Sequence, residues 1–184
     1  MVRQLFLKLR FVGMTQNTDQ EAIITTLQRL GFELKNPTAI RPEETRPEFI
    51  LTAEDYDGNP AFSHVLAYDS EMIDEDRSYI DWVHEWARAT EREDRVSDVA
   101  AHVDFDGGTS WLAYSLDGRN VRLEFEQEGD WIAFDVYDQM LDDFGTVPGH
   151  TTLYIDSGQA GVYIWVPENN VAEFTALIPE AVSG

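Results

Sequence analysis

The chain contains no cysteine among its 184 residues. Disulfide bonds, thiolate metal ligands and thiol nucleophiles are therefore excluded, and the composition suits a reducing compartment. Long apolar runs are also missing. The first residues, MVRQLFLKLRFVGM, are interrupted by Arg3, Lys8 and Arg10 and lack the features of a bilayer span or a signal peptide. We expect a soluble, cytoplasmic protein that does not insert into a membrane.

Positive charge is scarce. Thirteen Lys and Arg stand against 35 Asp and Glu, which gives a formal net charge of −22. Residues 1–50 carry 7 basic and 6 acidic residues, whereas residues 51–184 carry 6 and 29. Such a field repels nucleic acids and anionic lipids and attracts cationic partners. The charge therefore argues against binding to nucleic acid or membranes and favours a basic protein partner.

Lysine is the scarcest charged residue, with only Lys8 and Lys35 beside eleven arginines. A salt-adapted protein also carries many solvated surface carboxylates, because net charge governs solubility and association rather than fold. A salt-adapted acidic protein without a charge-selected partner therefore stays open as an alternative.

Recognised catalytic motifs are absent: the chain has neither a GxSxG elbow nor a glycine-rich phosphate loop. One constellation has metal-binding chemistry. His102 and Asp104 would share one face of a strand on which Val103 and Phe105 faced the core, and His150 could complete a two-histidine, one-carboxylate triad. A metal-dependent enzyme using these three residues is the second alternative, whereas the leading interpretation assigns no catalytic residue, metal or cofactor.

Hydrophobic periodicity predicts the elements of the first half. Alternation indicates a strand at residues 2–12, and apolar spacing in TDQEAIITTLQRLGF indicates a helix that ends at Gly31. Two strands are expected at 49–56 and 61–68. The segment 74–94 should form the longest helix, with Tyr79, Trp82 and Trp86 in the core.

Glycine turns organise the second half. The Asp117-Gly118 turn pairs Tyr114 with Val121 and Leu112 with Leu123. A second turn at Glu128-Gly129 then predicts a three-stranded meander over 110–137, followed by a short helix over 138–145. Another hairpin is predicted at 151–166, with Tyr154, Tyr163 and Trp165 buried beneath a helix, and a last helix at 168–178.

These elements predict an α+β fold with a mostly antiparallel sheet and helices packed on one face. The sheet would contain the N-terminal strand, the hairpins, the meander over 110–137 and the C-terminal hairpin over 151–166. We expect residues 1–184 to form a single domain, with a possible internal boundary in the proline-rich loop 36–48.

The meander register also predicts that one face of these three strands is exposed to solvent. It sets Trp111 opposite Glu124, Arg122 opposite Asp135, and Glu126 opposite Trp131, with Tyr137 at the end of the row. Charged groups cannot be buried there without compensation, whereas exposed aromatic rings are typical anchors of protein interfaces. The predicted partner-binding residues are Trp111, Glu124, Glu126, Trp131, Asp135 and Tyr137.

The sequence therefore favours an acidic binding or inhibitor protein of the immunity or antitoxin type. It would occlude a basic protein partner such as a toxin nuclease, whose substrate groove is positive. The metal-dependent enzyme and the salt-adapted protein are the alternatives, and the oligomeric state stays open.

Overall fold

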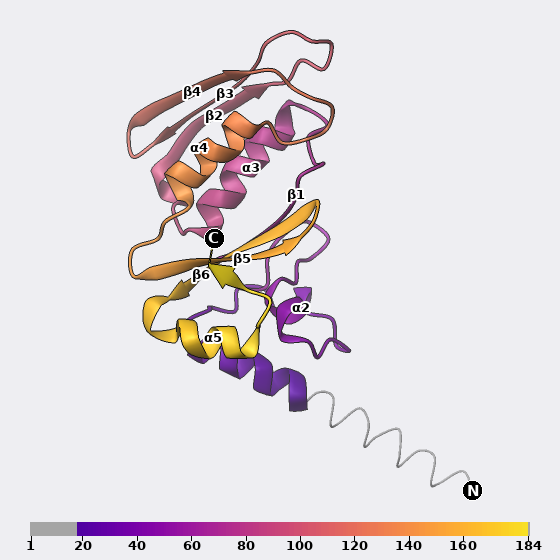
Figure 1. Cartoon of the computed structure of the whole chain (residues 1–184), viewed down its shortest axis with the longest axis vertical. Helices are drawn as coiled ribbons and strands as arrows, with labels where there is room; N and C mark the ends of the chain where they lie inside the picture. The colour runs from indigo at the N-terminus through magenta and orange to yellow at the C-terminus, as the bar shows by residue number, and fades with distance from the viewer. Residues whose placement is uncertain (1–17, 184) are drawn as a thin grey trace, which may run out of the picture.

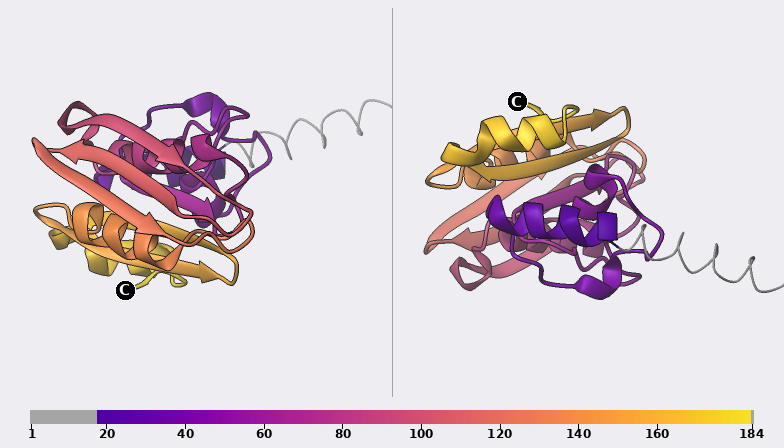
Figure 2. Two further views of the ribbon diagram at one scale, coloured as in Figure 1. Left: turned by 90° about the horizontal axis from the view of Figure 1, so that it is seen from above. Right: turned by 90° about the horizontal axis from the view of Figure 1, so that it is seen from below.

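The computed structural model describes residues 18–183 (Figure 1). The strand predicted at residues 2–12 lies outside the described residues. The described chain is built in four layers. From top to bottom in Figure 1, these are a three-stranded sheet, a pair of helices, a four-stranded sheet and a second group of helices. The two end-on views of Figure 2 show the small sheet outermost on one side and helices outermost on the other.

The upper sheet contains β2 (Val96–His102), β3 (Ser110–Leu116) and β4 (Arg119–Phe125) in the order β2-β3-β4. Both residues of the connecting turn, Asp117 and Gly118, have positive φ angles of 54° and 76°. A two-residue turn of this kind matches the twist of antiparallel strands. The predicted register is confirmed, with Tyr114 opposite Val121.

The prediction of a third meander strand after residue 129 is wrong. Residues 134–144 form helix α4 (Phe134–Phe144), and β2 takes the third place in the sheet. The backbone before α4 bonds elsewhere: Ile132 N–H donates to the carbonyl of Ser70 at 2.8 Å. Of the side chains that looked like an alternating strand, Val136 belongs to a helical face, on which it is buried with Met140 and Phe144 about one turn apart, whereas Phe134 is exposed.

The second layer consists of α4 and α3 (Asp76–Ala89). The predicted long helix is confirmed; it begins with a capping box between Glu75 and Ser78. Tyr79, Trp82 and Trp86 are fully buried between the two sheets, as expected.

The four-stranded sheet is buried on both faces. Its strands are β1 (Val65–Asp69), β6 (Ala160–Pro167), β5 (His150–Ser157) and the short β7 (Val182–Ser183), in the order β1-β6-β5-β7. The hairpin predicted at 151–166 is confirmed, and Ile155 lies opposite Val162. Tyr163 and Trp165 face the α3–α4 layer, which confirms their burial beneath helices, and Ile164 faces the lower helices.

The strand predicted at 49–56 is wrong. Residues 47–51 form α2 (Pro47–Leu51), in which proline occupies the first helical turn. Ile50 and Leu51 are fully buried in the lower core. β1 consequently pairs with β6. Of the expected hairpin, the described residues show a single bridge, between Glu54 and Pro60.

The lower layer contains residues 18–29, which are helical, together with α2 and α5 (Val171–Leu177). Two single-turn 3₁₀ helices, Pro37–Ala39 and Glu168–Asn170, flank them. The predicted stop at Gly31 is confirmed: its φ is +106°, a conformation that glycine adopts readily. The chain is therefore α+β with two antiparallel sheets and helices packed on them. Among residues 18–183, no helix combines the length and the apolar character needed to cross a bilayer.

Candidate functional site

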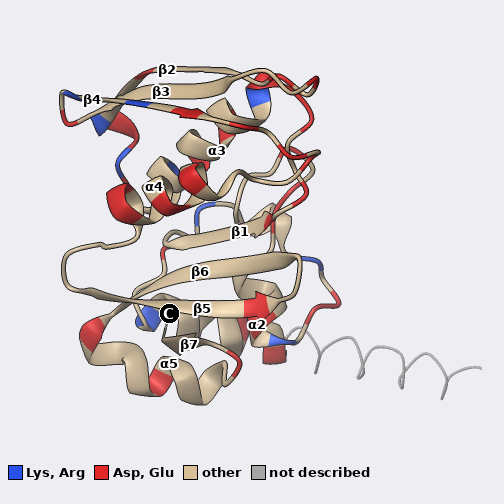
Figure 3. Ribbon diagram, turned by 45° about the horizontal axis from the view of Figure 1, so that its top comes forward, with Lys and Arg blue, Asp and Glu red and all other residues tan. Residues whose placement is uncertain are grey.

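Three loops, together with the adjoining ends of β1, α3 and α4, meet at one end of the upper sheet: residues 69–76, 103–106 and 126–135. Ile73 N–H donates to the carbonyl of Asp130 at 2.9 Å, and Val103 N–H donates to the Asp76 carboxylate at 2.6 Å. Ser110 pairs with Phe125, which brings the chain before β3 beside the chain after β4. We call these three loops the acidic end; they form the acid-rich loops at the upper right of Figure 3.

The acidic end carries an uncompensated negative charge. Its sequence contains no Lys or Arg. Within the described residues, none of its carboxylates forms an ion pair with a Lys or Arg, and Asp76 alone lies near a titratable base, 3.6 Å from His102 Nδ1. A cationic partner would meet these carboxylates without having to displace a Lys or Arg of residues 18–183. The carboxylates are Asp69, Glu71, Asp74, Glu75, Asp76, Asp104, Asp106, Glu126, Glu128, Asp130 and Asp135.

Exposed aromatic rings accompany this charge. Phe105, Trp131 and Phe134 have 48%, 45% and 84% of their surface exposed. The three belong to a small set of large apolar side chains that are exposed in residues 18–183, the others being Phe49, Tyr56 and Val182. Each of the three rings directly adjoins an aspartate in the sequence. Aromatic anchors beside charged groups are typical of protein interfaces.

Two of these rings line a groove of about 620 Å³ between the end of β4 and the start of α4. Its lining combines apolar side chains with carboxylates, so a ligand would bury apolar surface and meet negative charge together. The lining residues are Phe125, Glu126, Glu128, Trp131, Ile132, Ala133, Phe134 and Asp135.

Hydrogen bonds hold the groove loop in shape. The Gln127 side-chain amide donates to the carbonyls of Gly129 and Trp131 at 2.9 and 2.7 Å. The buried Tyr79 hydroxyl donates to Gln127 Oε1 and accepts from Ala133 N–H. Burial raises the pKa of Tyr79 to about 12, so this hydroxyl stays protonated at neutral pH. The indole of Trp131 is thus presented on a loop fixed at both ends.

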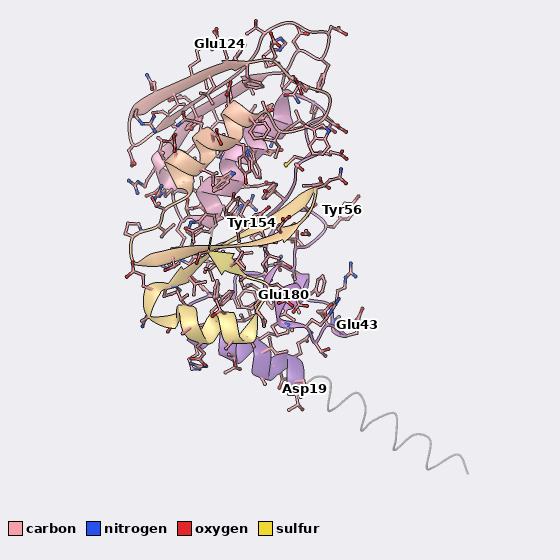
Figure 4. All side chains as sticks on the ribbon, in the orientation of Figure 1. Asp19, Glu43, Tyr56, Glu124, Tyr154 and Glu180 are labelled. Atoms are coloured by element: carbon pink, nitrogen blue, oxygen red, sulfur yellow. The ribbon has the colours of Figure 1, made fainter. Side chains whose placement is uncertain are left out.

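The outer face of the upper sheet forms a neighbouring surface that no other described element covers (Figure 2). Trp111 lies opposite Glu124 as predicted. The Arg122 guanidinium stands 4.5 Å above the Trp111 ring, and its Nε lies 3.4 Å from Glu124 Oε1. Figure 4 shows Glu124 on this outer side, away from the helices.

The structure therefore places the predicted binding residues in different parts of the molecule. Glu126, Trp131 and Asp135 come together in the groove, and Trp111 and Glu124 lie on the outer face of the sheet. The placement of Tyr137 is wrong: its hydroxyl bonds to Tyr68 at 3.1 Å and to Tyr163. It points toward the four-stranded sheet because residue 137 lies on a helix. Asp135 lies on α4 and Trp131 in the loop before it, so neither pairs across a strand.

Sequence reasoning missed Phe105, Phe134 and Glu128. Phe105 was expected in the core, but β2 ends at His102 and the chain turns away from the sheet. The Asp104 carboxylate accepts from Asp106 N–H at 2.9 Å and fixes this turn. Alternation along a strand had placed Phe105 opposite its aspartate neighbours, so nothing in the local pattern indicated that the strand ends at His102.

The proposed metal triad does not form. The His150 ring packs 4.8 Å from His64, whereas His102 lies on β2 beside Asp76 and Trp111. In residues 18–183, no group of three His, Asp or Glu side chains is arranged to hold a metal ion. His102, Asp104 and His150 are thus not a metal site in this fold.

A second pocket, of about 720 Å³, lies between the end of α3 and the loop before β1. Its lining contains both cations and anions, including Lys35, Arg88 and Glu91. Nearby, His64 Nε2 lies 3.8 Å from Glu91, and burial lowers the pKa of His64. The pocket therefore lacks the single sign of charge that distinguishes the acidic end.

Comparison with known protein families, curated proteins and solved structures finds no match to this chain.

Proposed function

We propose that this chain is an acidic binding protein that occludes a basic protein partner, in the manner of an immunity protein or antitoxin acting on a toxin nuclease. One observation carries the proposal: the acidic end combines exposed aromatic rings with carboxylates that no Lys or Arg of the described residues neutralises. A reducing compartment such as the cytoplasm suits a chain without cysteine, and the proposal places the protein there.

The physical case rests on two separate effects. Negative charge at the acidic end accelerates encounter with a positive groove, such as one built to hold a nucleic acid backbone. Desolvated aromatic rings then slow dissociation, because buried Trp and Phe anchors contribute most of the energy of an interface. Trp131 and Phe134 are placed to do this, since both line the groove and remain exposed in the free chain.

The distribution of arginine supports the same conclusion. All six arginines after residue 50 are occupied by contacts within the chain. Four form ion pairs with a carboxylate, and two donate to backbone carbonyls. Among the described residues, none of these six arginines forms an ion pair with a carboxylate of the acidic end. The six residues are Arg77, Arg88, Arg92, Arg95, Arg119 and Arg122.

The test compares groove variants with a matched surface control. The partner is first captured from host extract with the immobilised wild-type chain, identified, purified and titrated. Trp131→Ala combined with Glu126→Ala should weaken the complex by more than about 2 kcal/mol, roughly 30-fold in Kd, without unfolding the chain. Tyr56→Ala removes an exposed ring outside the acidic end and should leave Kd unchanged. An unaltered affinity in the double variant would remove the groove from the interface.

A salt-adapted protein without a charge-selected partner is the second candidate. The observation in its favour is that carboxylates are also exposed far from the acidic end, for example Glu21, Glu43 and Glu180. Such a protein needs screening of its self-repulsion to remain folded. Unfolding in buffer below molar salt would support this candidate over the binding protein.

A further inference from the structure

The edge of the upper sheet formed by β4 is open. The Asp117-Gly118 turn makes Leu116 and Arg119 a hydrogen-bonded pair, and the pairs alternate from there along the regular register with β3. The backbone N–H and C=O groups of Asn120, Arg122 and Glu124 consequently point away from β3. No hydrogen bond from the rest of residues 18–183 reaches them. All three residues are exposed.

The other strand edges are less suited to pairing. β2 is interrupted by a register shift between Ser97 and Ala100, where Asp98 has a φ of 55°. A bulge of this kind protects an edge against pairing. On the four-stranded sheet, β7 spans two residues, and β1 begins with the buried Val65 and Leu66. β4 is thus a regular edge strand of seven residues, of which Arg119, Asn120, Arg122 and Glu124 are exposed.

Charge around this edge favours a basic segment. The two arginines of β4 are already paired, Arg119 with Asp143 and Arg122 with Glu124. Below the strand runs α4, where Asp138 and Asp142 are exposed (Figure 3). At its C-terminal end, β4 leads directly into the groove at Phe125. A strand laid along β4 would therefore have carboxylates beneath it and at one end.

We propose that the partner contributes an extended, basic segment that adds to the upper sheet as a fourth strand beside β4, with one apolar side chain in the groove. This inference rests on the proposed function, because it specifies how the basic partner binds. Strand addition supplies affinity through main-chain hydrogen bonds and specificity through pockets for alternate side chains. The outward backbone N–H and C=O groups of Asn120, Arg122 and Glu124 supply the main-chain hydrogen bonds. The groove supplies the pocket for a side chain.

The probe is a synthetic ten-residue peptide of alternating Lys and Val with blocked ends. Its matched control has the same sequence but is N-methylated at its four central residues, so that neither edge of this central segment can donate a backbone hydrogen bond. We expect the unmethylated peptide to bind the full chain at least tenfold more tightly in calorimetry. Amide hydrogen exchange at Asn120, Arg122 and Glu124 should slow at least tenfold when it binds.

A variant pair tests the edge from the side of the chain. Arg122→Pro removes one outward N–H group, and proline is tolerated at such a position of an edge strand. Arg122→Ala removes the same side chain but keeps the N–H group. Peptide affinity should fall at least tenfold for Arg122→Pro relative to Arg122→Ala, with circular dichroism showing that both variants are folded.

The outcomes separate the two proposals. Equal affinity for the two peptides, or binding without protection of the β4 amides, would overturn strand addition and leave the binding function in place. Binding of neither peptide at low ionic strength, together with failure of the Trp131 and Glu126 double variant to affect the native partner, would overturn the proposed function as well.

Discussion

Gly161 is required by the packing of a single tyrosine. A Cβ atom built at this residue would lie 2.7 Å from Cε2 and 2.8 Å from Cζ of Tyr154. The Tyr154 ring crosses the neighbouring strand here, and its hydroxyl bonds to that of Tyr68 at 3.1 Å. Figure 4 shows Tyr154 between the α3–α4 layer and the sheet. The glycine therefore gives the ring the space in which it reaches the other tyrosines.

Gly161→Ala should accordingly destabilise the chain by about 1–3 kcal/mol, the usual cost of overpacking a core. Denaturant unfolding measures this change. In a Tyr154→Ala background the ring is gone, so the same substitution should cost much less. Equal costs in the two backgrounds would contradict the steric explanation.

Glu85 is the second residue with a measurable consequence. Burial raises its pKa to about 7, and nearby Glu54 and Asp81 act in the same direction, whereas Arg88 opposes them. The folded chain therefore binds a proton at Glu85 that the unfolded chain has lost above its ordinary pKa of 4.5. Stability consequently falls as pH rises from about 4.5 to 7, and the loss persists above that window.

Glu85→Gln should remove this part of the pH dependence. Because the side chain keeps some contact with solvent, we expect wild type to lose about 1–2 kcal/mol relative to the variant between pH 4.5 and 8. Free energies of unfolding at several pH values measure the difference. Glu43→Gln, at an exposed position, is the control and should follow wild type. Parallel pH profiles for Glu85→Gln and wild type would refute this assignment.

At the scale of elements, α4 is fixed to the upper sheet through one carboxylate. The Asp143 side chain is 8% exposed and pairs with Arg119 of β4. It also accepts hydrogen bonds from Tyr114 at 2.6 Å and Gln139 at 3.0 Å. Burial and the hydrogen bond to Asp143 raise the pKa of the Tyr114 hydroxyl, which therefore remains a donor.

Asp143→Ala should destabilise the chain by about 3 kcal/mol, because it leaves the Tyr114 hydroxyl buried without its acceptor and breaks a partly buried ion pair. The neighbouring Asp142 is exposed, and Asp142→Ala should change stability by less than about 0.5 kcal/mol. Thermal and denaturant unfolding compare the two. Similar losses for both variants would show that charge at the end of α4, rather than this contact, is responsible.

Local signals predicted the elements that depend on neighbouring residues. The Asp117-Gly118 turn fixed the register of β3 and β4, and the hairpin of β5 and β6 followed in the same way. The segment 130–137 was ambiguous, because Ile132, Phe134 and Val136 alternate while Val136 also belongs to a helical face. Long-range bonds to residues 70–73 decided between the two, and such contacts cannot be read from local spacing.

The candidate site was predictable to a similar degree. Glu126 and Trp131 were identified from charge and aromatic exposure, and both line the groove. Their predicted geometry depended on a strand that does not exist. Tyr79 and Gln127, which fix the groove loop, are far apart in the sequence. Nothing in the sequence pairs them.

At the scale of the whole molecule, the two faces of one sheet contribute to two separate hydrophobic cores. The four-stranded sheet packs α3 and α4 on one face and the lower helices on the other. The upper sheet has helices on one face only, so its outer face and the β4 edge remain available (Figure 2). The acidic end lies at the rim of that upper sheet, far from the helical segment 18–29 at the other end of the molecule (Figure 1).

This separation allows local steering to be distinguished from net charge. Association with a basic partner should slow about tenfold between roughly 10 and 200 mM ionic strength, because screening shortens the reach of the field. Glu124→Lys should slow association further at low salt and change dissociation little. Glu21→Lys makes the same change in net charge at the opposite end and should have a smaller effect. Stopped-flow kinetics resolve the rates; identical rates for the two variants, or none that respond to salt, would show that negative charge around the upper sheet does not guide the encounter.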